Sequence, residues 1–269
     1  MDKSEQQIIA YIRAHWPSEI PPKWRIADEA YPKILAQIIQ DLTPTATKSH
    51  QLFRLAGQSG SGKTSQLLPA TQSYFKKLKL SPILIAARSF VPYHPFAKAI
   101  ATAYGPENLR TKTNDSTTIL MFLTLKSLIA QGYDIILDVA FLDPLVESAL
   151  MQILSQQNYT TRCTMVALSK EISDQFVDQR KQRLVDQSTS SEFWRTTHLA
   201  LAFYAKHHPK LPIIVWSAWD LQPIYSGPIG NPKALSTIKK YQGIPTLPLS
   251  SPTPNQLRLS KITYLENTI

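Results

Sequence analysis

One short segment constrains the fold of this chain more than any other. Residues 57–64 read Gly-Gln-Ser-Gly-Ser-Gly-Lys-Thr, which fits the pattern G-x-x-x-x-G-K-[ST] at every defined position. That pattern forms a phosphate-binding loop, or P-loop, when a strand precedes it and a helix follows it. Here an apolar run at residues 51–56 comes before the segment, and residues 64–78 have the pattern of a helix. The sequence therefore predicts a nucleoside triphosphate site between a buried strand and a helix.

The glycines of such a loop let consecutive backbone N–H groups turn toward the phosphates, and the helix that follows adds the positive end of its dipole. We expect Lys63 to reach the β- and γ-phosphates and the Thr64 hydroxyl to bind Mg²⁺. The residues expected to bind the nucleotide are Gly57, Ser59, Gly60, Ser61, Gly62, Lys63, Thr64 and Ser65. The nucleotide is ATP or GTP, although no stretch reads as the guanine-selecting Asn-Lys-x-Asp of GTPase switches. The loop alone does not choose among hydrolases, kinases and switches.

Strand and helix patterns alternate along the chain around the P-loop. Further strands are predicted at residues 82–87, 133–138, 161–168 and 211–216, with helices at 117–131 and 144–157 between them. This alternation predicts an α/β, P-loop kinase-like fold, with right-handed crossovers and a mainly parallel sheet covered by helices on both faces. Ligands of such sheets bind beyond the carboxyl ends of the strands. We therefore expect the P-loop, Arg88 and Asp138 to lie at one edge of the sheet.

The pattern divides the chain into three parts. Residues 1–50 are predicted to form a helical prefix, with amphipathic helices at about 5–15 and 26–42. Residues 51–226 form the P-loop kinase-like domain. Residues 227–269 contain six prolines among serine, threonine, asparagine and basic residues, and we expect an extended basic arm that wraps the domain or stays mobile.

Charge and composition narrow the partners and the compartment. The formal net charge is +10, from 29 basic and 19 acidic residues, which suits anionic phosphates, an acidic protein partner or nucleic acid. Nucleic acid is the minor alternative, because no basic module interleaved with aromatic residues is present. The single cysteine, Cys163, has no internal partner for a disulfide, no run of eighteen apolar residues occurs, and the N-terminus is unlike a secretory signal. We expect a cytoplasmic protein with no membrane segment.

Several further motifs occur in a distinctive order. Gln58 follows the first glycine of the P-loop, and a His-Pro-Phe motif begins at His94. Residues 131–138 form the end of a helix and a strand, and the strand ends at Asp138. Arg180 and Arg195 follow the next strand. In this order and spacing, residues 52–226 resemble the zeta toxin family, the P-loop kinases of bacterial toxin–antitoxin systems.

The resemblance implies an activity and roles for particular residues. Members of the family phosphorylate UDP-N-acetylglucosamine and related UDP-sugars, so it implies a kinase with a small nucleotide-sugar acceptor and an antitoxin partner. It implies that Arg180 and Arg195 grip the transferring phosphate and that Arg88, His94 and Asp138 face the acceptor. Without the resemblance, Arg180 and Arg195, which belong to the family's lid region, fit an exposed basic helix face equally well. His94 then fits a structural turn residue.

The chain departs from the family pattern at the acceptor end. The family has a catalytic Asp six residues before the His of His-Pro, and this chain has Arg88 there. A guanidinium is charged at every physiological pH and cannot act as a general base. The family's substrate-binding Glu falls at or near Phe122, and a Gly-Thr-x-x-Arg stretch is replaced at residues 139–142.

Three explanations of these departures remain open. In the first, the protein uses a different acceptor, with Asp138 or another carboxylate as base. In the second, it transfers the phosphoryl group slowly without a base, since positioning and charge neutralisation carry most of this catalysis. In the third, it binds a nucleotide without catalysis and binds a protein partner or nucleic acid. A kinase acting on a nucleic-acid end or another metabolite is a further alternative. For Asp138 we favour a role at the metal or the acceptor over a helix cap.

Overall fold

The protein is built on one six-stranded sheet. The computed structural model describes residues 3–141, 143–179 and 187–268. The strands are β1 (Gln51–Ala56), β2 (Ile83–Ala86), β3 (Ile135–Asp138), β4 (Thr160–Ala167), β5 (Pro212–Ser217) and β6 (Tyr225–Pro228). Their order in the sheet is β2-β3-β1-β4-β5-β6, and only β6 runs antiparallel to its neighbour. The predicted α/β fold with a mainly parallel sheet is confirmed.

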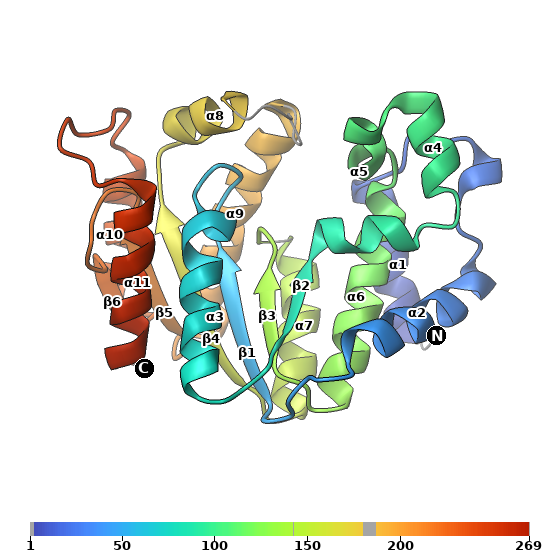
Figure 1. The fold of residues 1–269 in the computed structure, drawn as a ribbon, viewed down its shortest axis with the longest axis horizontal. Coiled ribbons are helices and arrows are strands. Elements are labelled where there is room, and N and C mark those ends of the chain that lie inside the picture. Colours follow the sequence, from blue (N-terminus) through green and yellow to red (C-terminus); the bar gives the residue numbers. More distant parts are fainter. Residues whose placement is uncertain (1–2, 142, 180–186, 269) are drawn as a thin grey trace.

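Helices cover both faces of this sheet (Figure 1). The α-helices are α1 (Lys3–His15), α2 (Tyr31–Leu42), α3 (Leu68–Lys77), α4 (Ala97–Tyr104), α5 (Leu109–Lys112), α6 (Asn114–Ala130), α7 (Pro144–Gln156), α8 (Lys170–Asp178), α9 (Gln187–His207), α10 (Pro232–Gln242) and α11 (Pro254–Thr268). The short helical turns are η1 (Pro22–Trp24), η2 (Asp28–Ala30), η3 (Lys63–Leu67), η4 (Ala87–Tyr93) and η5 (Pro106–Asn108). None of the helices in the described ranges has the length and apolar character needed to cross a bilayer.

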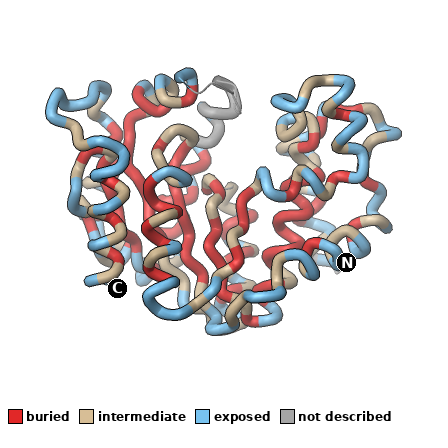
Figure 2. Tube along the Cα trace, viewed as in Figure 1, coloured by how far each residue is buried: buried red, intermediate tan, exposed pale blue. Residues whose placement is uncertain are grey.

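The two faces of the sheet follow the two-residue alternation of its strands. Phe53 and Leu55 of β1 point to one face, where they pack with residues of α3 and α11. Leu52 of β1 packs on the other face with residues of α6 and α7. In Figure 2 strands β1, β2, β3 and β5 are buried along most of their length between these layers, whereas β6 at the sheet edge is largely accessible. Because both faces are covered, the strands read as continuous apolar runs in the sequence.

The N-terminal prefix packs on α6. Ile8 and Ile12 of α1 and Ile38 of α2 lie in the same core cluster as the α6 side chains. Helix α6 is buried around most of its circumference because α1 and α2 cover the side that the sheet does not. The two predicted prefix helices are present, but the second begins at Tyr31 because η1 and η2 occupy residues 22–30.

The C-terminal segment differs from its prediction. Instead of an extended arm, most of residues 227–269 forms α10 and α11, whose first turns begin at Pro232 and Pro254. Proline suits the first turn of a helix, so these two prolines start helices rather than prevent them. Leu257 and Leu265 recur at helical spacing and are buried, the latter in the core cluster that holds α3. Among the described residues of this segment, irregular structure occupies the short turn at 229–231 and the connection at 243–253.

Candidate functional site

The P-loop joins β1 to η3 at the carboxyl edge of the sheet. Gly57, Gly60 and Gly62 have φ values of 123°, 80° and 91°, a region that other residues rarely adopt. A Cβ added to Gly60 would lie 2.4 Å from the backbone oxygen of Ser173, and one added to Gly57 would lie 2.9 Å from Ser61 Oγ. The turn of the loop and its close contact with α8 therefore both require glycine.

Polar groups of the loop converge on its interior. Lys63 Nζ donates to the carbonyl oxygens of Gly57 at 2.6 Å and Gln58 at 2.8 Å, so the ammonium lies over the loop. The Ser61 hydroxyl is buried and has no hydrogen-bond partner in the described part of the chain. Buried polar groups without partners are rare in folded proteins. A cradle of left-handed glycines, an ammonium and an orphaned hydroxyl fits the phosphates of a nucleotide.

Asp138 lies directly beside the P-loop threonine. The parallel pairing aligns Asp138, the last residue of β3, with Leu55 of β1 and Ala86 of β2. The Thr64 hydroxyl donates to Asp138 Oδ2 at 2.9 Å. A hydroxyl and a carboxylate are oxygen donors of the kind that Mg²⁺ prefers. The pair would suit a magnesium ion, which would supply positive charge beside the loop.

Helix α8 closes over the loop from the β4 side. Gln58 is buried and donates from Nε2 to the Leu168 carbonyl at 2.7 Å, and Ser173 of α8 donates to the Ser59 carbonyl. The P-loop is thus attached to the segment that leads toward the predicted lid arginines. Arg195 is exposed on α9, whereas Arg180 lies outside the described residues.

The side of the site where the sequence predicts the acceptor is built from η4, α6 and the end of β3. Arg88 is exposed in the first turn of η4, directly beyond the carboxyl end of β2. His94 ends η4 and is 2 % exposed; its Nδ1 accepts from the Phe96 N–H at 3.3 Å, and burial lowers the pKa of the ring to about 4. Phe122 and Val139 are also buried, at 5 % and 8 % exposure. The structure brings Arg88 to the open edge of the sheet and keeps His94 inside, as a neutral turn residue.

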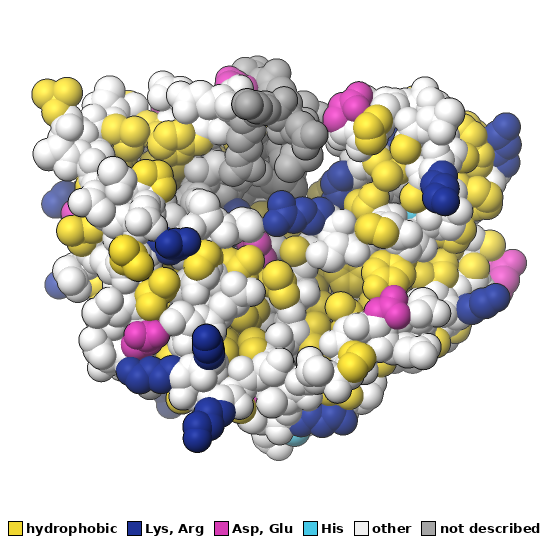
Figure 3. All heavy atoms as spheres, in the orientation of Figure 1, with side chains coloured by type: hydrophobic (Ala, Val, Ile, Leu, Met, Phe, Trp, Pro, Cys, Tyr) yellow, Lys and Arg dark blue, Asp and Glu magenta, His cyan; other side chains and the backbone are white. Residues whose placement is uncertain are grey.

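The surface at this edge is hollowed. Figure 3 shows a depression between the α3 side of the molecule and the lobe formed by α4 and α5, with lysine or arginine side chains gathered at it. Positive charge at the mouth of a cleft attracts anionic ligands and raises their rate of association. The hollow lies beyond the carboxyl ends of the strands, where parallel sheets of this kind bind their ligands.

Sequence reasoning missed a buried ionic group beside this edge. Arg54 of β1 and Glu147 of α7 form an ion pair at 2.6 Å with side chains 4 % and 0 % exposed, and the Tyr204 hydroxyl of α9 donates to Glu147. Arg54 also lines a cavity of about 10 Å³ with Phe122 and Val139, where its Nε and Nη1 have no partner in the described chain. The signal was present in the sequence, because an arginine within an apolar strand requires a buried partner.

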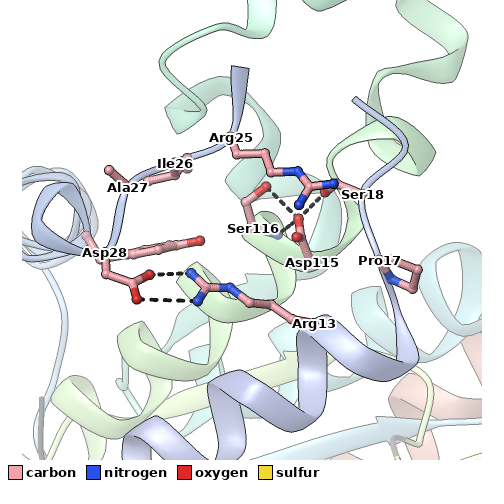
Figure 4. Close-up of a pocket in the computed structure, with 10 residues that line it drawn as sticks. Arg13, Pro17, Ser18, Arg25, Ile26, Ala27, Asp28, Asp115 and Ser116 are labelled. Carbon is pink, nitrogen blue, oxygen red and sulfur yellow. Dashed lines mark hydrogen bonds and ion pairs between the residues drawn. The ribbon is translucent and has the colours of Figure 1, made fainter. Parts of the chain in front are cut away.

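A second polar pocket, also missed, lies between residues 13–31 of the prefix and the start of α6. Figure 4 shows that Arg13 pairs with Asp28 across it, while Ser18 and Ser116 both donate to Asp115 at the start of α6. The pocket has a volume of about 350 Å³. These contacts attach the turn-rich segment 17–30 to the first turn of α6.

A P-loop after the first strand of the sheet, with an acidic strand end beside its threonine, defines the class of P-loop nucleotide-binding folds. The family model described as "Zeta toxin" matches residues 36–205, more than half of the chain. The chain belongs to the zeta toxin family.

Solved structures agree with this fold. The chain is similar to a structure from the PezAT chromosomal toxin–antitoxin system of Streptococcus pneumoniae, with a TM-score of 0.66 and 18 % identity over 90 % of this chain and 98 % of that one. It is also similar to the AvrRxo1-ORF1:-ORF2 crystal structure with ATP, with a TM-score of 0.52 and 13 % identity over 98 % and 84 % of the two chains. None of the curated proteins compared with the chain matched it.

Proposed function

We propose that the protein is a kinase that transfers the γ-phosphoryl group of ATP or GTP to a hydroxyl of a UDP-sugar, such as UDP-N-acetylglucosamine, as the toxin of a toxin–antitoxin pair. The observation that carries the proposal is the Thr64–Asp138 hydrogen bond of 2.9 Å beside a complete P-loop. Family membership supports the reaction class. The PezAT similarity supports an antitoxin partner, and the AvrRxo1 complex with ATP supports a nucleotide.

Each residue of the loop has a defined task in this proposal. The backbone N–H groups of residues 60–64 and the Lys63 ammonium bind the β- and γ-phosphates. Thr64 and Asp138 hold the magnesium ion, which supplies charge neutralisation at the phosphates. Arg180 and Arg195 close over the transferring group, where planar guanidinium groups pair with phosphate oxygens. The acceptor oxygen forms the new O–P bond, the bond to the leaving diphosphate breaks, and the acceptor proton passes to a base or to water.

The acceptor end decides how fast this reaction runs. Asp138 accepts a hydrogen bond from Thr64, the residue that holds the metal in this proposal, so its geometry favours the metal side of the site over the role of general base. Arg88 and the outer face of η4 contact the acceptor in this proposal, Arg88 through the anionic diphosphate of a UDP-sugar. A contact between His94 and the acceptor requires the buried ring to become exposed.

A second function is favoured by one specific observation. Arg88 stands where the family has its catalytic Asp, and neighbouring acceptor positions are buried apolar side chains such as Phe122. On this basis the protein binds a nucleotide without transferring its phosphoryl group, and its basic surface binds a protein or nucleic-acid partner.

One experiment separates the two functions. The protein is incubated with labelled ATP or GTP, Mg²⁺ and a panel of UDP-sugars, beside the Lys63→Ala variant. The kinase labels a sugar and arrests growth on expression, and Lys63→Ala loses both effects. Tight nucleotide binding with no label on any sugar supports the second function, and growth arrest that persists in Lys63→Ala contradicts the kinase proposal.

A further inference from the structure

Lys261 is a buried lysine in the C-terminal helix. It lies in α11, beyond the residues 36–205 that the family model matches, and its exposed fraction is 0 %. Helix α11 lies beside α3, the helix that continues from the P-loop (Figure 1). A lysine is almost never fully buried without a partner, so the surroundings of Lys261 indicate what it does.

The ammonium of Lys261 has three neighbours of different chemistry. Nζ donates to Gln66 Oε1 at 3.1 Å and lies 4.8 Å from the centre of the Trp216 ring at the end of β5. Burial lowers the pKa of Lys261 to about 7, while the carboxylate of Asp220 opposes this effect. The lysine thus joins α11 to η3, the first turn after the P-loop.

Gln66 in turn contacts the P-loop itself. Its side chain is 8 % exposed, and a Cβ added to Gly62 would lie 3.1 Å from Gln66 Nε2. The N–H groups of both Gln66 and Leu67 bond to the Gly62 carbonyl, at 2.8 Å and 3.4 Å, which widens this turn. The side-chain amide of Gln66 therefore supports the backbone at Gly62, and its orientation is set by the proton donor that holds Oε1.

We propose that Lys261 is a positioning residue for nucleotide binding. By holding the Gln66 amide against Gly62, it keeps the backbone of the P-loop in the conformation that binds phosphate. This inference rests on the proposed binding of a nucleotide by the P-loop and extends it to a helix outside the family match. An uncompensated buried ammonium destabilises a fold, and an apolar side chain of the same length would pack there at lower cost. Stability therefore does not explain why a lysine stands at this position, whereas a role in positioning Gln66 does.

A matched set of variants tests the proposal in the full chain. Lys261→Met keeps the aliphatic stem over Trp216 and removes the donor, and Gln66→Met removes the acceptor. Lys77→Met is the control, because Lys77 also joins α3 to α11, by donating to the Glu266 carbonyl at 2.7 Å, at the end of α3 away from the P-loop. The readouts are the dissociation constants of Mg²⁺–ATP and Mg²⁺–GTP by calorimetry, and the melting temperature of each variant.

We expect Lys261→Met and Gln66→Met each to weaken nucleotide binding about tenfold, the equivalent of one positioning hydrogen bond. The double variant should bind no more weakly than either single one, because both act through the same contact. Lys77→Met should bind as the wild type does. If Lys261→Met fails to fold, Gln66→Met alone decides.

Three results would overturn the proposal. These are wild-type affinity in a folded Lys261→Met or Gln66→Met, additive losses in the double variant, and an equal loss in Lys77→Met. The calorimetric assay measures nucleotide binding and not phosphoryl transfer. A failure of the kinase proposal can therefore be told apart from a failure of the role of Lys261. A wild type that binds nucleotide but labels no acceptor contradicts the kinase proposal alone, whereas unaltered affinity in the variants contradicts only the role of Lys261.

Discussion

At the scale of single residues, the site depends on backbone conformations that only glycine adopts cheaply. Gly60 combines a φ of 80° with a backbone oxygen of α8 only 2.4 Å from the position that a Cβ would take. A side chain can move away from a new methyl group, but a backbone carbonyl within a helix moves only with its helix. The P-loop and α8 are therefore coupled at this residue.

We expect Gly60→Ala to weaken nucleotide binding at least about tenfold, because a left-handed alanine costs roughly 1–2 kcal/mol before the contact with Ser173 is relieved. Calorimetry with Mg²⁺–ATP measures the loss. Gly243→Ala is the control: its φ is −81° and its nearest contact is 3.4 Å, so affinity and melting temperature should stay near those of the wild type. Equal affinity in Gly60→Ala would contradict the coupling.

Arg88 permits a test by gain of function. If the missing base limits the rate more strongly than the acceptor contact proposed for Arg88 supports it, Arg88→Asp should raise phosphorylation of a UDP-sugar, since a general base contributes about 10²–10⁴-fold. Arg88→Ala removes the positive charge without adding a base and is the control. Faster transfer in both variants would assign the effect to charge, and slower transfer in both would make Arg88 an acceptor ligand.

At the scale of elements, a buried ionic group joins β1, α7 and α9. Arg54, Glu147 and Tyr204 are each almost inaccessible to water, and the guanidinium carbon of Arg54 also lies 4.6 Å from the centre of the Phe141 ring. Burial raises the pKa of the Tyr204 phenol well above its usual value, and the Glu147 carboxylate adds to this effect. Removing one member leaves its partner desolvated and unpaired.

Glu147→Gln should therefore lower the free energy of unfolding by about 3–5 kcal/mol. Glu19→Gln, which breaks the exposed pair with Lys112, should cost less than about 1 kcal/mol. Urea denaturation of both variants measures the difference. Replacing the pair by Arg54→Met with Glu147→Leu should recover much of the loss, and a double variant as unstable as Glu147→Gln would contradict the assignment of the loss to an unpaired charge.

At the scale of the whole molecule, the buried Lys261 makes stability depend on pH. Burial lowers its pKa to about 7 in the folded state, against 10.5 for an ordinary lysine. Between these values the unfolded chain binds the proton and the folded chain does not. The free energy of unfolding therefore rises as pH increases from about 7 to 10.5, and this contribution is lost as pH falls.

Comparison with Lys261→Met isolates this contribution. The variant should be more stable than the wild type near pH 7, by up to about 4 kcal/mol, and the difference should shrink toward zero by about pH 10.5. Guanidinium denaturation across this range measures it. A difference that stays constant with pH would show that Lys261 titrates normally.

The sequence alone was enough for much of the architecture. The P-loop, its flanking strand and helix, and the acidic end of β3 are local patterns. Parallel strands bring their carboxyl ends to one edge whatever their exact order, so Arg88 and Asp138 could be placed beside Gly57–Thr64 without coordinates. The two prefix helices were also readable, because their apolar spacing is set within each helix.

Tertiary structure decided what depends on contacts between distant segments. Prolines suggested an extended arm, yet residues 254–268 form a helix that buries Leu257, Lys261 and Leu265 and packs beside α3, since tertiary packing outweighs local propensity. Arg54 and Glu147 are 93 residues apart, and Gln66 and Lys261 are 195 apart. Local periodicity carries no information about which buried charge meets which partner. The sequence determined the phosphate cradle and the edge on which it lies; only the folded chain determined the buried side chains that support it.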